Sequence, residues 1–143
     1  MKTVIQRVTM AKVEVDGKTV GEIKNGFLVL AGFTHGDTKA DCDRIAKKIS
    51  GLRIFSDEND KINLSLRDVG GEILCVSQFT LYADCTHGNR PSFINAARPE
   101  EAQPLYDYFC AALSEYAHTE KGIFGADMKV SLLNDGPFTV IIE

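Results

Sequence analysis

Two hydroxyl side chains, Ser77 and Thr80, follow an apolar stretch and are the first candidates for chemistry in this chain. A hydroxyl nucleophile needs a neighbouring base, and the segment Ser77-Gln78-Phe79-Thr80-Leu81 contains none. A Ser–His–Asp triad on Ser77 would need a histidine brought to it from a distant polar segment. The Gly-x-Ser-x-Gly motif of α/β-hydrolases is absent. Thr80 therefore stays open as either a nucleophile or a hydroxyl that bonds the backbone and stiffens a turn.

The main chain of this segment offers a second kind of chemistry. We expect a strand over residues 72–79, and a strand that ends abruptly leaves N–H groups without partners. Two such donors can hold the oxyanion that forms when an ester carbonyl is attacked. Ser77, Gln78, Phe79 and Thr80 are therefore the predicted catalytic residues, with their backbone amides as the active groups.

A Gly-Pro pair, Gly136-Pro137, stands between two apolar runs at residues 130–133 and 140–142. Both runs are typical of strands. Proline has no N–H for a strand ladder, and glycine before proline tolerates backbone angles that other residues resist. The pair is therefore a rigid kink set into a sheet, and on its own it is typical of a plain β-turn.

Taken together, the motifs Ser-Gln-Phe-Thr-Leu and Asn-x-Gly-Pro-x-Thr resemble those of the D-aminoacyl-tRNA deacylase family. Other segments match the family in the same order along the chain: Ile5-Gln6-Arg7-Val8, Arg53-Ile54-Phe55-Ser56-Asp57, Gly88-Asn89-Arg90-Pro91-Ser92-Phe93, Pro99-x-x-Ala102 and Phe124-Gly125-Ala126-Asp127-Met128. One departure is Phe138, which stands where the family motif has valine.

The resemblance implies a homodimer with an active site at the subunit interface. It implies that the amides near Phe79 and Thr80 form an oxyanion hole, and that the 2′-hydroxyl of the terminal adenosine helps to activate water. It also implies that Gly136-Pro137 is cis, is oriented by Arg7, and enters the partner's pocket. There its carbonyls exclude an L side chain but accept a D side chain. Glycyl-tRNA has no Cβ to clash with them, so we expect it to be hydrolysed to some degree.

The same resemblance implies a slot for the 3′-adenosine of the tRNA acceptor end, lined by Ala102, Phe124 and Met128. On the sequence alone, Phe124 and Met128 are more typical of core residues. The family reading needs no cofactor and no metal. Cys85 and His87 lie two residues apart, but two ligands do not make a zinc site.

Composition limits the remaining classes. The 143 residues are 44% hydrophobic and 25% charged, which is typical of one globular domain over residues 1–143. The longest apolar run, residues 26–33, is too short to span a membrane, so we expect a cytoplasmic protein with reduced, mostly buried cysteines. A net charge of −4 argues against DNA as a partner and against binding along a long stretch of any nucleic acid. Contact with only the end of a nucleic acid stays possible.

Periodicity predicts a strand-rich chain with two helices. We expect a helix after Asp37, its N-cap, with Cys42, Ile45, Ala46 and Ile49 buried, and a second helix from Pro99. The second helix buries the stripe Ala102, Leu105, Tyr106, Phe109, Leu113 and Tyr116. Strands are expected over residues 2–9, 12–15, 18–23, 27–33, 52–55 and 72–79 and on both sides of the Gly-Pro kink, with a loop at 119–122. The predicted fold is α+β, a mainly antiparallel sheet or barrel with two amphipathic helices outside.

Three rival functions stay open. A related enzyme with a trans Gly-Pro bond would clear a mischarged L-aminoacyl-tRNA. A non-catalytic module would only bind nucleic-acid ends, although the chain lacks an aromatic and basic stacking platform. A broad esterase would use Thr80 as its nucleophile.

Overall fold

One long strand, β1 (Lys2–Val15), runs through the sheet of the computed structural model, which describes every residue from Met1 to Glu143. Along one edge it pairs antiparallel with β3 (Gly26–Gly32) and then with β2 (Lys18–Ile23). Along the other edge it pairs antiparallel with β8 (Lys129–Ile142). The segments 2–9 and 12–15 are thus one strand, and the two runs around the Gly-Pro pair are also one strand.

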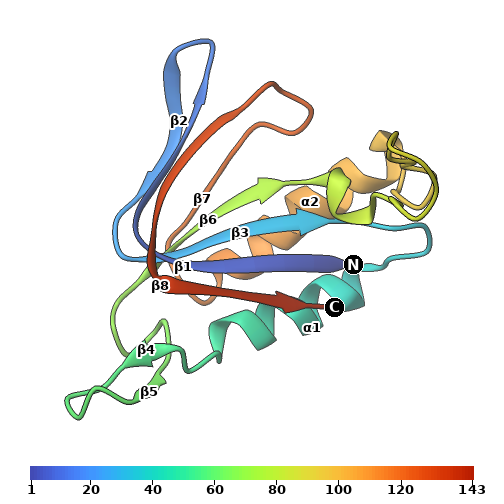
Figure 1. Ribbon diagram of the computed structural model, residues 1–143. Helices are drawn as coiled ribbons and strands as arrows, with labels where there is room; N and C mark the ends of the chain where they lie inside the picture. Colours follow the sequence, from blue (N-terminus) through green and yellow to red (C-terminus); the bar gives the residue numbers. More distant parts are fainter.

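The sheet continues past β3 through two parallel pairs. β6 (Glu72–Ser77) lies parallel to β3, and β7 (Thr119–Lys121) lies parallel to β6, giving the order β2-β1-β3-β6-β7. The sheet curls until β2 approaches β7 (Figure 1): a Cβ atom on Gly21 would lie 2.8 Å from the carbonyl oxygen of Lys121. The predicted α+β fold, a mostly antiparallel sheet nearly closed into a barrel, is confirmed. β4 (Phe55–Ser56) and β5 (Ile62–Leu64) form a separate small hairpin.

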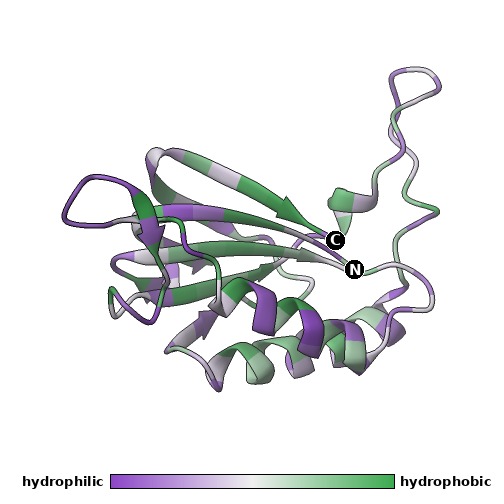
Figure 2. Cartoon of the chain, turned by 90° about the horizontal axis from the view of Figure 1, so that it is seen from below, coloured by the Kyte–Doolittle hydropathy of each residue, from purple (hydrophilic) through white to green (hydrophobic).

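Two helices, α1 (Lys39–Ser50) and α2 (Pro99–Ser114), lie side by side against the outer face of the sheet (Figure 2). The predicted buried face of α1 is confirmed, and α2 begins at Pro99 as expected. The stripe predicted for α2 is too long, because Tyr116 lies beyond the last helical residue and is exposed. Neither helix has the length and apolar character needed to cross a membrane.

Alternate residues of the central strands face two separate cores. Phe27, Val29 and Ala31 of β3 belong to the larger core, between the sheet and the helices. Leu28 of β3 and Leu74 of β6 belong to the smaller core, inside the barrel. β3 and β6 are therefore buried on both faces, which explains their nearly continuous apolar sequences. The carboxyl ends of these two strands reach the candidate site.

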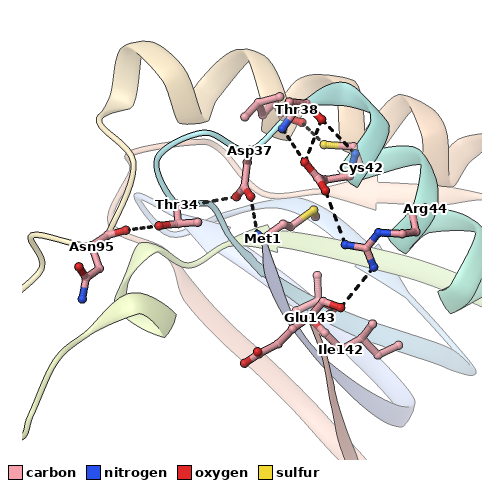
Figure 3. Close-up of polar contacts among 12 residues, drawn as sticks. Met1, Thr34, Asp37, Thr38, Cys42, Arg44, Asn95, Ile142 and Glu143 are labelled. Atoms are coloured by element: carbon pink, nitrogen blue, oxygen red, sulfur yellow. Dashed lines mark hydrogen bonds and ion pairs between the residues drawn. The ribbon is translucent and has the colours of Figure 1, made fainter.

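The start of α1 corrects one prediction. Thr38, not Asp37, is the N-cap, and it forms a capping box with Asp41. Asp37 is engaged elsewhere: one carboxylate oxygen accepts a hydrogen bond from the Met1 amino group at 2.6 Å, and the other accepts one from the Thr34 N–H at 2.8 Å (Figure 3).

Three predicted element boundaries were also wrong. The strand expected to end at residue 79 ends at Ser77, and the 3₁₀ helix η1 (Phe79–Tyr82) follows it. The strand expected over residues 52–55 is reduced to β4. The loop expected at 119–122 contains β7, whose three residues have too short a pattern to predict a strand.

Candidate active site

A cavity of about 580 Å³ opens where β3 and β6 end. This volume is in the usual range for small-molecule sites. Twelve of its 18 lining residues are hydrophobic. They come from the ends of β3 and β6, the segment before α2, the first turn of α2 and the segment before β8. The cavity therefore offers an apolar slot assembled from parts of the chain that are far apart in sequence.

Unpaired backbone donors lie at the edge of this cavity. The Gln78 N–H donates to the Ala31 carbonyl at 2.8 Å, which is the last bond between this chain segment and β3. The chain then turns into η1, and the N–H groups of Phe79 and Thr80 fall in its first turn. A helix has no earlier carbonyl to accept from its first N–H groups, and no side chain caps this end. The abrupt strand end that the sequence predicts is present, two residues earlier than expected.

The side chains of the same segment do not form a nucleophile and base pair. Thr80 is exposed, does not line the cavity, and accepts a 2.5 Å hydrogen bond from the Gln78 side-chain amide. An amide cannot take a proton from a hydroxyl. His35 contacts the Ile94 carbonyl and Glu101, and His118 contacts Glu72 and Glu120. Neither they nor the third histidine, His87, hydrogen-bonds Ser77 or Thr80, and none lines the cavity. A Ser–His–Asp triad is not assembled.

The three residues predicted to hold adenosine line this same cavity. Ala102 comes from α2, and Phe124 and Met128 come from the segment before β8. Phe124 rests against the buried ring of Tyr106, with 5.9 Å between ring centroids. Met128 lies where a Cβ atom on Gly122 would be 2.5 Å from its sulfur, so the glycine leaves it room. The structure brings these residues together with Ser77, Gln78 and Phe79.

One wall of the cavity was missed by the sequence analysis. It comes from the segment between η1 and α2, which extends past the end of the sheet (Figure 1, yellow) and includes Phe93, Ala96, Ala97 and Arg98. The Phe93 ring meets the Phe79 ring edge to face, with 5.1 Å between centroids. The match of Gly88-Asn89-Arg90-Pro91-Ser92-Phe93 to the family was the only signal pointing here.

Hydrogen bonds tie this wall to the end of β3. The Ala97 N–H donates to the Phe33 carbonyl at 2.9 Å, and the Thr34 hydroxyl donates to the Asn95 carbonyl at 2.6 Å (Figure 3). Thr34 also binds Asp37, which binds Met1. The loop wall is therefore supported by the same polar network that precedes α1.

The Gly136-Pro137 pair lies outside this chain's own cavity. Its peptide bond is cis, as the resemblance implied. β1 and β8 pair at Gln6–Thr139 and again at Val8–Asn134, so residues 135–138 bulge out of the ladder opposite Arg7. Asp135, Gly136 and Pro137 are exposed. The bulge is thus presented outward.

The Arg7 side chain binds the main chain of this bulge. Its Nε donates to the Asp135 carbonyl at 2.9 Å, and its Nη1 donates to the Ile54 carbonyl at 2.6 Å. Only 11% of its side chain is exposed, so Arg7 is not a free surface charge. The expected hydrogen bond between Arg7 and the motif is present.

Asn134 closes the bulge from the side. Its Oδ1 accepts a hydrogen bond from the Phe138 N–H at 2.7 Å, and its Nδ2 donates to the Thr139 hydroxyl at 3.0 Å. Gly136 has a φ of +142°, and a Cβ atom there would lie 2.9 Å from the Phe138 nitrogen. The position therefore favours glycine on both backbone and steric grounds.

A family model described as "D-Tyr-tRNA(Tyr) deacylase" matches residues 4–143. The chain belongs to this family. A relative named "D-aminoacyl-tRNA deacylase" from Thermus aquaticus is 57% identical over all of this chain and 95% of its own length. A relative of the same name from Halalkalibacterium halodurans is 53% identical over all of this chain and 99% of its own.

Two solved structures share the fold. The protein titled "c-Myc DNA Unwinding Element Binding Protein" is 41% identical, with a TM-score of 0.94, and the match covers all of this chain and 98% of that one. A structure titled as a probable eukaryotic D-amino acid tRNA deacylase has a TM-score of 0.84 over 99% of this chain and 97% of its own. Its identity of 18% makes it a likeness of fold alone.

The cysteines of this family member lie apart from the chemistry. Cys42, Cys75 and Cys110 are buried, as predicted, and Cys85 is exposed. Burial raises the pKa of the Cys42 thiol to about 12 and raises that of Cys75 as well, so both stay protonated and are poor nucleophiles. No group of three or more His, Cys, Asp or Glu side chains is placed to hold a metal ion.

Proposed function

We propose that this chain hydrolyses the ester bond of D-aminoacyl-tRNA, releasing the D-amino acid and tRNA and so removing amino acids of the wrong hand from translation. One observation carries the chemistry: the uncapped start of η1 leaves the N–H groups of Phe79 and Thr80 without helical partners, and Phe79 lines an apolar cavity that no histidine lines. Family membership over residues 4–143 carries the substrate class. Such a substrate places the enzyme in the cytoplasm, where aminoacyl-tRNA is used.

In the proposed reaction, the 3′-adenosine rests against Ala102, Phe124 and Met128. The ester carbonyl then points to the N–H groups of Phe79 and Thr80, which stabilise the negative charge that develops on its oxygen. The ribose 2′-hydroxyl helps to activate a water molecule, whose oxygen attacks the carbonyl carbon. The bond to the ribose 3′-oxygen breaks, and that oxygen leaves with a proton. No cofactor is required.

Chirality is selected by a second subunit. In the proposed homodimer, Gly136 and Pro137 of one subunit enter the cavity of the other and present their carbonyl oxygens to the α-carbon. Two features support this arrangement: the bulge is exposed and rigid, and it does not line its own cavity. Leu133 and Ile141 of β8 are 59% and 65% exposed, and a partner would cover such apolar side chains.

The decisive experiment compares D-alanyl-, L-alanyl- and glycyl-tRNA on one tRNA body. The D form should react about a thousandfold faster than the L form, which corresponds to about 4 kcal/mol between transition states. Glycyl-tRNA, with no Cβ to collide, should be hydrolysed measurably. Comparable rates for the D and L forms would overturn the proposal, and inertness toward glycine would overturn selection by exclusion.

The same assay decides between the rival functions. An enzyme that clears mischarged L-aminoacyl-tRNA would prefer L-alanyl-tRNA. A module that only binds nucleic-acid ends would leave all three esters intact while still retaining tRNA. A broad esterase acting through Thr80 would hydrolyse both hands at similar rates and would also accept simple esters without a tRNA body.

A further inference from the structure

The Phe138 side chain lies directly against the guanidinium of Arg7. The distance from the Arg7 Cζ atom to the ring centroid is 5.0 Å, within the range of a cation–π contact. Phe138 is half-buried and packs on the larger core, and its N–H is bound by Asn134. Core packing and the Asn134 hydrogen bond therefore fix the ring independently of its contact with Arg7.

The guanidinium is consequently held by two hydrogen bonds and by an aromatic contact. Nε donates to the Asp135 carbonyl, Nη1 donates to the Ile54 carbonyl, and Cζ lies over the Phe138 ring. Nη2 lies 3.2 Å from the point that a Cβ atom on Gly136 would occupy, so the guanidinium directly adjoins the motif. An arginine side chain has many rotamers, and the contact with the Phe138 ring reduces the freedom that the two hydrogen bonds leave.

We propose that Phe138 is a positioning residue for the choice between D and L substrates. It acts through Arg7, which in turn fixes the direction of the Asp135–Pro137 backbone. This role rests on the proposed function. The simpler reading is that Phe138 only fills space beside the larger core, and the two readings differ in one measurable quantity. Core packing affects stability and all substrates alike, whereas positioning changes the ratio of D to L hydrolysis.

The test uses Phe138→Leu, which keeps apolar bulk and removes the aromatic face, and Phe138→Tyr, which keeps the face. Deacylation of D- and L-alanyl-tRNA and the midpoint of thermal unfolding are measured for each. Phe138→Leu should lower the D-to-L ratio about tenfold, mainly by raising L hydrolysis, since a desolvated cation–π contact is of that size. Phe138→Tyr should keep the wild-type ratio.

Two further variants separate positioning from packing. Val140 lies on the same strand, packs on the same core and is not among the hydrogen-bond or aromatic partners of Arg7, so Val140→Ala should lower the unfolding midpoint and leave the ratio unchanged. In an Arg7→Gln background, Phe138→Leu should cause no further loss of the ratio, because its effect passes through the guanidinium.

The outcomes are distinct. An unchanged ratio in Phe138→Leu, or equal losses on both substrates, overturns the positioning role and leaves the proposed function standing. A further tenfold loss in the Arg7→Gln background also overturns it. A wild-type enzyme with no preference for the D form would overturn the proposed function itself, and the role of Phe138 with it.

Discussion

The cavity beside η1 and the bulge at residues 135–138 are opposites in how their polar groups are satisfied. At the cavity, the N–H groups of Phe79 and Thr80 have no partner in the helix that they begin. At the bulge, side chains of Arg7 and Asn134 reach in to bind the main chain on both sides. Open donors can bind a ligand, whereas a turn that side chains hold by hydrogen bonds resists displacement.

Under the proposed function, this difference suits the two regions to different tasks. A reaction centre needs groups that become satisfied in the transition state, which the open amides provide. A steric filter needs a surface that does not yield, and a packed, hydrogen-bonded turn provides that. The cavity and the bulge have complementary properties, but a single chain does not bring them together. The proposed site therefore needs two subunits.

The largest effect is expected from the substrate. A D-aminoacyl-tRNA that ends in 2′-deoxyadenosine should react about 10²–10⁴-fold more slowly, because no histidine lines the cavity and its one carboxylate, Asp127, is engaged with Lys129. Competition by the deoxy tRNA against the normal substrate serves as the control for binding. A normal rate with the deoxy substrate would show that the enzyme supplies its own base.

A mixed-subunit experiment tests whether the bulge of one subunit excludes L substrates from the cavity of its partner. Gly136→Ala should distort the bulge and admit L substrates, and Ala126→Trp should fill the cavity and abolish activity. Adding tenfold excess of the cavity variant should lower L-alanyl-tRNA hydrolysis by the Gly136→Ala variant about tenfold, because most of its cavities then receive an intact bulge.

In that mixture, hydrolysis of D-alanyl-tRNA should be retained. Unchanged L hydrolysis after verified subunit exchange would show that each bulge serves its own chain.

Light scattering should give about 31 kDa, twice the chain mass of 15.7 kDa, and an active monomer would contradict the shared site.

A smaller effect is expected from the Thr80 side chain. Thr80→Ala removes the hydrogen bond with Gln78 but keeps the backbone N–H, so activity should fall no more than about tenfold, as for one neutral hydrogen bond. Steady-state deacylation of D-alanyl-tRNA measures it. A dead Thr80→Ala enzyme, combined with normal hydrolysis of the deoxy substrate, would make Thr80 the nucleophile.

The smallest effect on activity is expected from a change outside both regions. Thr38→Ala removes the N-cap of α1 and should lower the free energy of unfolding by about 1 kcal/mol, leaving the D-to-L ratio unchanged. Denaturant titration followed by circular dichroism measures the loss. A changed ratio would mean that the helix layer is coupled to the selection of hand.

Acid should weaken the same cap. Hydrogen bonds from the Thr38 backbone and side chain hold the pKa of Asp41 below its usual 3.8. A lowered folded-state pKa contributes stability above the unfolded value, and that stability is lost as pH falls through the folded value. The stability difference between wild type and Asp41→Asn should therefore be full above pH 3.8 and shrink in more acidic solution.

The sequence predicted best where local pattern and tertiary burial agree. The buried face of α1 has the helical spacing that its packing requires, and the strand expected over residues 18–23 is β2 with the same bounds. The predicted site residues divide as the structure divides them: Ala102, Phe124 and Met128 share the cavity with Phe79, and Arg7 lies with Gly136.

The errors arose where distant contacts outweigh local preference. Asp37 is a good N-cap residue, but the Met1 amino group and the Thr34 N–H occupy its carboxylate. β7 is a polar segment of three residues, and only its place beside β6 makes it a strand. The contact between Phe138 and Arg7 joins residues 131 positions apart, so no periodicity could reveal it.

The boundary between Ser77 and Phe79 should also appear as a difference in the rate of amide hydrogen exchange. β6 is buried on both faces, so its amides should exchange with deuterated solvent only through rare openings of the whole sheet. Two residues later, the N–H groups of Phe79 and Thr80 that begin η1 have no carbonyl acceptor in that helix, so their protons should exchange early in the same experiment. A bound analogue of the ester oxyanion would slow these two amides first, which makes them natural reporters of an occupied site.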